Sequence, residues 1–244
     1  MKAPTTLPNK RIRVPERLLI VGASARAAAE SAVRGGFLPL AVDQFGDEDL
    51  RRIADLRTCD HFPEQIPARA AELPPAGVVL TGAMENHPTI LKRLTNVRRL
   101  YGCPLEALAA VRNPLVVQSA LDRADLPTVA TSRRMPTITP GVRWLKKPLR
   151  GSSGAGICLQ TDSSSASGED SFYYQKLLHG PSQSGFFLAS RRTTTLVGVT
   201  EQWIGTPWLH ARPFGYAGSL GPLRLDAEAR NLWERIGTAL SQSC

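Results

Sequence analysis

The amino-terminal part of the sequence alternates between short apolar runs and segments rich in alanine or charge. The run RLLIVG (17–22) ends at a glycine, and the following SARAAAESAVRGG (24–36) favours a helix that paired glycines end. A second apolar run ends at Asp43, a helix with acids in its first turn is indicated over 47–55, and a third buried strand is predicted over 77–82. Strands that alternate with helices predict a parallel sheet with helices on its faces.

The remainder of the chain changes from helices to hairpins. Three helices are predicted after Pro88, from Pro104 and from Pro114, because proline is tolerated at the first helical position. Beyond Pro127, short extended runs between glycine- and serine-rich turns predict antiparallel hairpins. The runs are VRWLKKPL (142–149), ICLQT (157–161), SFYYQKLL (171–178), SGFFLAS (184–190) and TTTLVGVTEQWIG (193–205), with a polar turn over 161–170.

The last stretch, 226–243, has the period of an amphipathic helix that Asp226 could cap. We therefore predict a chain of mixed α/β and α+β class. A loose arm over 1–16 with three prolines precedes a parallel, Rossmann-like α/β domain over 17–112. A second domain of antiparallel strands and helices spans 113–244. The apolar face of the last helix would carry Leu225, Ala229, Leu232, Trp233, Ile236 and Leu240.

The charge balance narrows the class of partner. Lysine and arginine total 30 against 21 acids, a formal net charge of +9, which attracts phosphate groups. However, the basic residues come as isolated pairs, and no aromatic-rich strand resembles a base-stacking platform. We therefore assign the charge to solubility and to attraction for small anionic ligands, and we do not expect nucleic acid as the partner.

The cysteines, the histidines and the hydropathy of the chain argue against a disulfide-rich, zinc-binding, membrane or secreted protein. Four cysteines and four histidines are scattered without a CxxC spacing, so neither a disulfide framework nor a zinc cluster is predicted. No window approaches the roughly 18 to 20 apolar residues of a membrane-spanning helix, and the basic start lacks the apolar region of a secretory signal. We expect no membrane association and a cytoplasmic protein.

The turn Gly22-Ala23-Ser24-Ala25-Arg26 is the first place where chemistry could occur. A glycine turn before a helix can present free N–H groups to an anion. The turn lacks the later glycines of a dinucleotide fingerprint, although Asp43 stands where a ribose-binding acid would. A dinucleotide site, a structural turn and part of a substrate pocket all stay open, and Arg26 is the candidate substrate contact.

The second place is the segment from Trp144 to Ile157, in which lysines at the end of an apolar strand precede a loop with three glycines. Small residues expose backbone N–H groups to a phosphate chain, and a strand lysine can add a point charge. The alternative is a hairpin turn with surface lysines. The third place, Phe172 to Leu188, is by itself an ordinary hairpin, but it follows the glycine loop by about twenty residues and ends in a polar residue and glycine.

Together these segments resemble the ATP-grasp superfamily, whose members typically ligate a carboxylate to an amine through an acyl phosphate. The likeness runs from about Arg17 to Leu240. LKKPLRGSSGAGI (145–157) looks like the strand and glycine loop over the triphosphate, and YYQKLLHGPSQSGFFLA (173–189) like the adenine-reading hinge, often QEFIEG. VGASARAAAESA (21–32), at the start of a pre-grasp domain, and TEQWIG (200–205) look most like the small ligases of tetrahydromethanopterin and one-carbon cofactor synthesis.

The resemblance implies a set of ATP-binding residues. Lys147, or Lys146 if the register slips, would contact the α- and β-phosphates. Gln175 would line the adenine site with the backbone of the next residues, and His179 stands at the ribose position. The phosphate-covering loop would consist of Gly151, Ser152, Ser153, Gly154 and Gly156, and the adenine-lining backbone of Lys176, Leu177 and Leu178.

The chain also departs from the family pattern. Lys176 replaces the usual glutamate after glutamine, and His179 replaces the second glutamate, although a neutral histidine can accept one hydrogen bond. The helix that normally begins with Asp-Lys has Arg112-Asn113-Pro114 instead. Either one cationic phosphate contact is missing or Arg112 takes its place.

The family's magnesium ligands, an acid and a Glu-x-Asn motif, follow the last helix, and the sequence ends at Cys244 before them. The resemblance implies ATP and Mg²⁺ as cofactors, but we assign no metal ligand. We expect a truncated ATP-grasp domain, with the amino-terminal subdomain and the start of the carboxyl-terminal one. Turnover should be impaired, and Leu232, Trp233, Ile236 and Leu240 should lack the strands that would cover them.

The leading hypothesis is therefore an ATP-dependent carboxylate–amine ligase whose carboxylate and amine are unidentified. The alternatives are a non-catalytic nucleotide- or metabolite-binding protein and, third, a basic nucleic-acid-binding protein. Arg212 in HARPFGYAG is a second candidate for holding a substrate carboxylate, with a surface arginine as the alternative. No catalytic residue and no oligomeric state are predicted.

Overall fold

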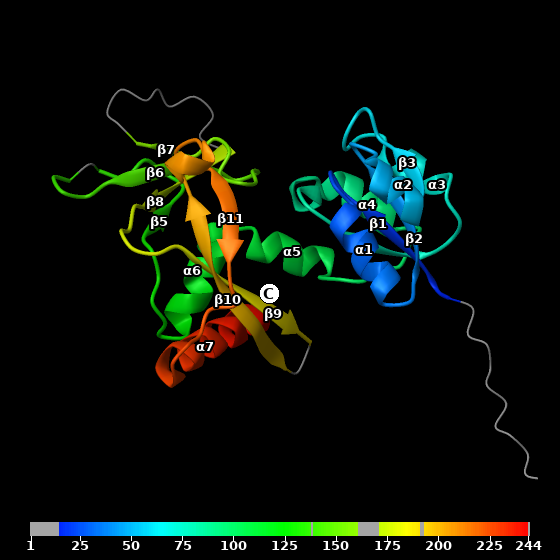
Figure 1. Cartoon of the computed structure of the whole chain (residues 1–244). Helices are drawn as coiled ribbons and strands as arrows, with labels where there is room; N and C mark the ends of the chain where they lie inside the picture. The colour runs from blue at the N-terminus through cyan, green and yellow to red at the C-terminus, as the bar shows by residue number, and fades with distance from the viewer. Residues whose placement is uncertain (1–14, 138, 161–170, 191–192, 244) are drawn as a thin grey trace, which may run out of the picture. The chain divides into compact units, whose positions relative to one another are not determined.

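The computed structural model describes residues 15–137, 139–160, 171–190 and 193–243. They form two compact units, one ending at Cys103 and the other beginning at Pro104 (Figure 1). The second unit therefore begins ahead of the boundary predicted at residue 112. Residues 1–14 of the predicted arm and the predicted polar turn over 161–170 lie outside the described residues. No helix in the described part of the chain is long and apolar enough to cross a membrane.

The first unit contains the parallel sheet that the apolar runs predicted. Its strands are paired in the order β3-β2-β1-β4, all parallel. The interiors of the central strands β1 and β2 are apolar, and Leu19, Ile20 and Val42 in them, like Val78 in the edge strand β4, are fully buried. The elements are β1 (Arg17–Val21), α1 (Arg26–Arg34), β2 (Leu38–Asp43), α2 (Glu48–Ile53), β3 (Asp55–Thr58), α3 (Ile66–Ala71), β4 (Gly77–Leu80), the 3₁₀ turn η1 (Met84–Asn86) and α4 (Pro88–Thr95).

Strand β3 and helix α3 were not predicted from the sequence. The segment DLRT has only four residues and carries two charges, so it lacks the apolar run of a buried strand. It is a strand because it pairs in parallel with β2, with Leu40 opposite Asp55 and Asp43 opposite Thr58. The helix predicted over 47–55 accordingly ends at Ile53. Pairing with β2 makes this segment a strand although its own residues have little preference for strand structure.

Asp43 is a structural carboxylate in the first unit. Its side chain is fully buried, and its Oδ2 accepts a hydrogen bond from the Ala25 amide at 2.6 Å. Its Oδ1 accepts from the amides of Phe45 and Gly46, both at 2.7 Å. Since buried backbone amides satisfy both oxygens, Asp43 ties the end of β2 to the start of α1 and does not offer a carboxylate to a ribose.

Gly22 has an equally local role. A Cβ atom at this position would collide with the Thr81 hydroxyl, which donates to the Ser24 carbonyl at 2.9 Å. The glycine thus allows the turn after β1 to approach the end of β4 closely. Of the three interpretations of the turn over 22–26, these contacts support the structural one.

The second unit contains the predicted antiparallel strands in two sheets. Their orders are β5-β8-β6-β7 and β11-β10-β9. Pro114 occupies the first position of its helix, as predicted, whereas Pro104 immediately precedes its helix. The elements are α5 (Leu105–Val111), α6 (Pro114–Arg123), β5 (Thr131–Ser132), β6 (Trp144–Pro148), β7 (Cys158–Leu159), β8 (Phe172–Lys176), β9 (Gln183–Ala189), β10 (Thr194–Ile204), η3 (Pro207–Leu209), β11 (Tyr216–Leu220) and α7 (Ala227–Ser243).

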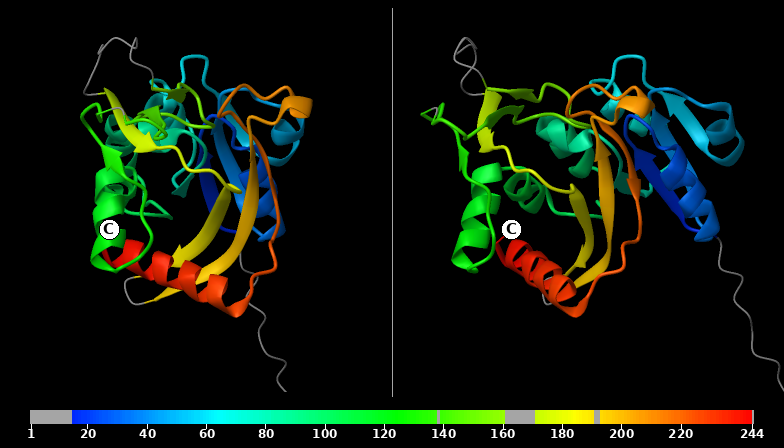
Figure 2. Two further views of the ribbon diagram at one scale, coloured as in Figure 1. Left: turned by 90° about the vertical axis from the view of Figure 1, so that its left-hand side faces the viewer. Right: turned by 60° about the vertical axis from the view of Figure 1, so that its left-hand side comes forward.

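Helix α7 is amphipathic as predicted, but its apolar face is covered. The helix packs along β9 and β10 and against α6 (Figure 2). The ring centroids of Trp233 and Phe187 lie 6.3 Å apart, and at Gly237 a Cβ atom would overlap the Phe187 ring. The side chains of Leu232, Trp233, Ile236 and Leu240 are all at least partly buried. The expectation that this face lacks covering strands was therefore wrong.

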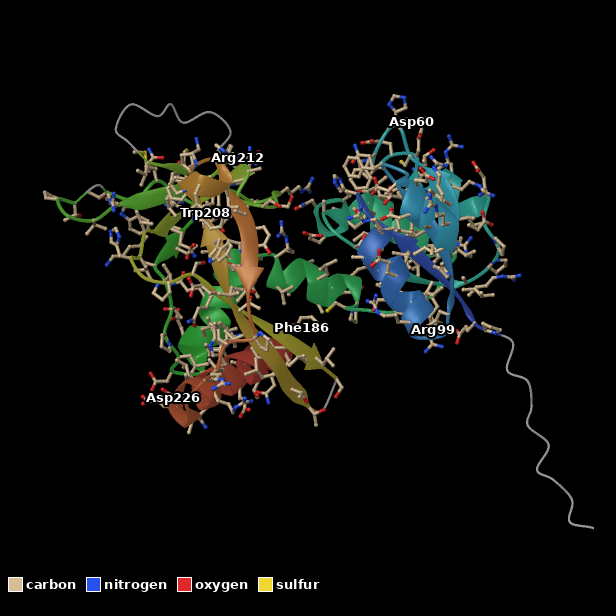
Figure 3. All side chains as sticks on the ribbon, in the orientation of Figure 1. Asp60, Arg99, Phe186, Trp208, Arg212 and Asp226 are labelled. Atoms are coloured by element: carbon tan, nitrogen blue, oxygen red, sulfur yellow. The ribbon has the colours of Figure 1, made fainter. Side chains whose placement is uncertain are left out.

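The exposed apolar surface lies on the other face of the same sheet. Successive side chains of a strand point to opposite faces, so the neighbours of Phe187 point away from α7. Phe186 (labelled in Figure 3) and Leu188 are each 62% exposed, and Val197 in β10 is 54% exposed. The face of β9 and β10 opposite α7 is therefore exposed at these three positions.

Candidate functional site

Register places two of the predicted residues on one face of the β6–β8 pair. Lys147 lies opposite Tyr173 and Leu145 opposite Gln175. Directly opposed residues of antiparallel strands share a face, so Lys147, Tyr173 and Gln175 lie together. Lys146 is on the reverse face, where its ammonium lies 4.5 Å from the centre of the Phe172 ring. The structure thus distinguishes the two lysines between which the sequence left a choice.

The side chains on the first face are in direct contact. Lys147 Nζ donates to Gln175 Oε1 at 3.0 Å and lies 5.7 Å from the centre of the Tyr173 ring. The Gln175 amide in turn donates to the hydroxyl of Thr131 in β5 at 3.4 Å. Burial lowers the pKa of the Lys147 ammonium. The cation is therefore partly desolvated beside a neutral amide, where an anion would stabilise it.

The glycine loop between β6 and β7 forms a tight turn over 151–156. Ser153, Gly154 and Gly156 all have left-handed backbone conformations, with φ of 53°, 74° and 75°. A Cβ at Gly154 would collide with the carbonyl oxygen of Phe214, and the Ser153 carbonyl accepts from the Tyr216 amide at 3.1 Å. The loop is therefore fastened to the segment between β10 and β11, and glycine is required at 154 for space as well as conformation.

Arg112 joins the loop from the opposite side. It follows the last residue of α5, and its Nη2 donates to the Gly151 carbonyl at 3.0 Å and to the Leu149 carbonyl at 3.5 Å. Burial raises the pKa of the Tyr173 phenol, and the Arg112 cation opposes that rise. The next residue, Asn113, caps α6 by accepting from the Leu115 amide at 3.1 Å. Arg112 therefore belongs to the loop's surroundings rather than to helix α6.

These groups line one cavity of about 450 Å³ in the second unit. Its wall combines the α5–α6 junction, the β6–β8 face and the glycine loop that directly follows β6. Of the ATP-binding residues that the resemblance implied, six line it: Lys147, Gly151, Ser152, Ser153, Gly154 and Gln175. Arg112, which the sequence analysis offered as a possible substitute for a missing cationic contact, and Tyr173 also line it. Tyr173 was missed, although its spacing of two from Gln175 in a strand is a usable signal.

The remaining hinge residues are outside the lining of this cavity. Lys176 is exposed on the same face of β8 as Tyr174, and Leu178 is 57% exposed. The Leu177 amide donates to the Arg143 carbonyl at 2.8 Å. The Arg143 guanidinium lies 2.8 Å from His179 Nε2, and since arginine only donates, that nitrogen is the acceptor. The hinge after β8 is thus held to the start of β6.

The two candidate substrate arginines are placed differently. Arg26 is half exposed and lies 3.4 Å from Asp49 and 3.8 Å from Asp47, so acids of α2 and its N-cap surround it. Arg212 is exposed on the segment between β10 and β11 (Figure 3), where its carbonyl accepts from the Gly215 amide at 2.8 Å. Gly156 and Arg212 are not in the described lining of the cavity.

A larger cavity of about 720 Å³ lies in the first unit between α3 and α4. It contains no residue that the sequence analysis singled out. The Arg98 guanidinium at its edge donates to the carbonyls of Leu73 and Pro74 at 2.9 and 2.8 Å and closes the turn after α3. Arg98 therefore has a structural role at this cavity. We take the smaller cavity, which contains the predicted residues, as the candidate site.

The residues of the candidate site fit an anion and do not fit a magnesium ion. The described lining offers a lysine, an arginine, a phenol and backbone amides, but no carboxylate, the ligand that Mg²⁺ prefers. Among the described residues, no group of three or more His, Cys, Asp and Glu could hold a metal. We therefore derive no step through a metal.

Comparisons with solved structures show that the fold of the chain is a known one. No protein-family model and no curated protein sequence matches the chain. The L-amino acid ligase of Bacillus licheniformis superposes with a TM-score of 0.65 and 16% identity, over 92% of this chain and 60% of that one. The N5-carboxyaminoimidazole synthetase of Staphylococcus aureus, complexed with ADP, gives 0.63 and 18%, over 92% and 63%.

A third similar structure carries the superfamily's name. It is a protein from Archaeoglobus fulgidus described as belonging to the ATP-grasp superfamily, with a TM-score of 0.60 and 14% identity, over 92% of this chain and 72% of that one. The present chain thus spans less than two thirds of the length of the ligase and the synthetase. Over the part that it spans, the chain has the fold of the ATP-grasp superfamily.

Proposed function

We propose that the chain binds ATP in the cavity of the second unit and that it acts as, or as part of, an ATP-dependent carboxylate–amine ligase. The observation that carries the proposal is the meeting of Lys147, Gln175 and the glycine loop in one cavity. Lys147 and the loop are close in the sequence, whereas Gln175 comes from a later strand, β8, and the cavity that they share lies in a fold found in nucleotide-binding ligases. The synthetase with the same fold was solved with ADP.

The electrostatics of the cavity favour a polyphosphate. Lys147 and Arg112 both line it, and the described lining contains two basic side chains and no carboxylate. Removal of Lys147 from water strengthens its attraction for phosphate oxygens, because the local dielectric is lower than that of water. Lys147 would hold phosphate oxygens as a point charge, and the loop amides would add directional hydrogen bonds.

The chemistry proposed for the site has two balanced steps. A substrate carboxylate oxygen attacks the γ-phosphorus of ATP, and the bond from that phosphorus to the β–γ bridging oxygen breaks, which releases ADP and forms an acyl phosphate. An amine then attacks the acyl carbon, phosphate leaves with the electrons of the C–O bond, and the amine loses a proton to water. Lys147 would offset phosphate charge as it shifts in the first step.

We expect Lys147→Ala to weaken ATP binding about 10- to 100-fold, since a charge-assisted hydrogen bond contributes about 1.5 to 3 kcal/mol. Lys146→Ala is the matched control, because it removes the same charge from the reverse face of the same strand. Its dissociation constant should stay within about twofold of the unmodified chain's. The measurement is calorimetric titration with ATP, and equal weakening by both variants would show that the site is elsewhere.

The second candidate is a nucleotide-binding protein without turnover. The feature that favours it is the described lining, which supplies phosphate contacts and no carboxylate ligand for a metal. The two candidates differ in ADP release. A chain that binds ATP but releases no ADP with pairs of L-amino acids, or with bicarbonate and an amine, would favour the binding protein, whereas saturable ADP release would establish the ligase.

A further inference from the structure

Arg112 binds backbone carbonyl groups of the glycine loop in addition to lining the cavity. One guanidinium nitrogen donates to two backbone carbonyls, those of Leu149 and Gly151, on either side of Arg150. These residues form the first limb of the glycine loop, directly after β6. A group that served only to attract an anion would not need to bind neutral carbonyl oxygens of the chain.

The contact constrains the loop at the point where it leaves the strand. Peptide units are planar, so a carbonyl that points to Arg112 fixes the direction of the amide on its other side, here the N–H groups of Arg150 and Ser152. Because Arg112 holds the carbonyls of Leu149 and Gly151, it fixes the orientation of the peptide units on both sides of Arg150. The far limb is fixed separately, through Gly154 at Phe214 and Ser153 at Tyr216.

Arg112 also belongs to the cavity that the loop covers. It lines that cavity with Lys147, and its cation acts on the Tyr173 phenol, whose ring lies over Lys147. The same side chain therefore spans the anion-binding wall and the backbone of the loop above it. Arginine suits this task because its planar fork presents several donors in fixed directions, whereas lysine presents a compact point charge.

We propose that Arg112 is a positioning residue, which holds the first limb of the glycine loop over the polyphosphate cavity by bonding the carbonyls on both sides of Arg150. Its role is distinct from that of Lys147, which contacts the anion itself in the proposed function. Removal of Lys147 costs affinity and leaves the loop in place. Replacement of Arg112 by lysine keeps the charge and releases the loop.

Arg150 provides a direct reporter of loop position. It is exposed and precedes Gly151, so trypsin can cleave between them once the limb detaches from Arg112. Under limiting trypsin, the cleavage rate follows the population of the open loop. We expect Arg112→Lys in the full chain to raise the rate at Arg150–Gly151 at least about fivefold, with Lys147→Ala close to the unmodified chain.

The matched control is Arg133→Lys. Arg133 also donates to a backbone carbonyl of this unit, that of Phe172 in β8, at 2.9 Å, but not to the glycine loop. The Arg133→Lys variant should be cleaved at Arg150 at the same rate as the unmodified chain. Amide hydrogen exchange over 150–157 on the same samples gives a second readout, and the tryptophan fluorescence spectrum shows that each variant is folded. Arg112→Lys with unmodified cleavage and exchange would overturn the proposal.

A measurement of ATP affinity depends on the proposed function, whereas the cleavage and exchange measurements do not. If ATP binds, Arg112→Lys should weaken it at least about tenfold despite the retained charge, because the loop is no longer preorganised over the phosphates. If ATP does not bind even the unmodified chain, the proposed function fails, while faster cleavage of Arg112→Lys would still establish the positioning role. The two failures are therefore distinguishable.

Discussion

Asp43→Ala is expected to lower the free energy of unfolding of the first unit by about 3 to 7 kcal/mol. The substitution leaves the buried amides of Ala25 and Gly46 without their acceptor, at about 1 to 3 kcal/mol each, and the part-buried amide of Phe45 adds about 1 kcal/mol. Because a whole small domain is stable by only about 5 to 15 kcal/mol, this loss would bring the unit close to unfolding at ordinary temperature.

The sequence offers a way to follow the two units separately. All four tryptophans lie in the second unit, so tryptophan fluorescence reports that unit alone. Urea denaturation of Asp43→Ala should shift a transition seen by far-UV circular dichroism and leave the fluorescence transition in place. Asp47→Ala, which removes a partly exposed acid near Arg26 that makes no side-chain cap bond to α2, should change the free energy by about 1 kcal/mol or less. A circular dichroism transition that does not move for Asp43→Ala would contradict the structural role.

Gly154→Ala is expected to lower the free energy of unfolding of the second unit by about 2 to 5 kcal/mol. The left-handed conformation at φ 74° destabilises an alanine by about 1 to 2 kcal/mol relative to glycine. Its Cβ also collides with the Phe214 carbonyl, and the resulting backbone shift costs about 1 to 3 kcal/mol more. The collision forces the glycine loop away from the segment between β10 and β11.

Gly156→Ala separates these two causes. Gly156 has nearly the same φ, 75°, but a Cβ there would meet only Pro148 at an ordinary 3.4 Å. The control should therefore lose only the conformational part, about 1 to 2 kcal/mol. Urea denaturation followed by tryptophan fluorescence measures both variants in the unit that contains them. Equal losses at the two positions would mean that Phe214 does not hold the loop.

Much of the fold and part of the site could be predicted from the sequence. Buried parallel strands are continuous apolar runs, so β1, β2 and β4 were evident, whereas the short, charged β3 was not. The residues alone indicated a lysine before a glycine loop and an ordinary hairpin around Gln175, and only the resemblance to the ATP-grasp superfamily implied that the two segments form one nucleotide site.

Contacts between distant segments were decided by the tertiary structure alone. Register put Lys147 rather than Lys146 beside Gln175, and the α5–α6 junction brought Arg112 to the glycine loop. The sequence showed that α7 has an apolar face, but only the path of the chain showed that Phe187 covers it. It likewise presented Asp43 as a candidate ligand contact, and the fold surrounds that carboxylate with amides. Periodicity and propensity are local, whereas the partner of a side chain depends on which remote segment packs against it.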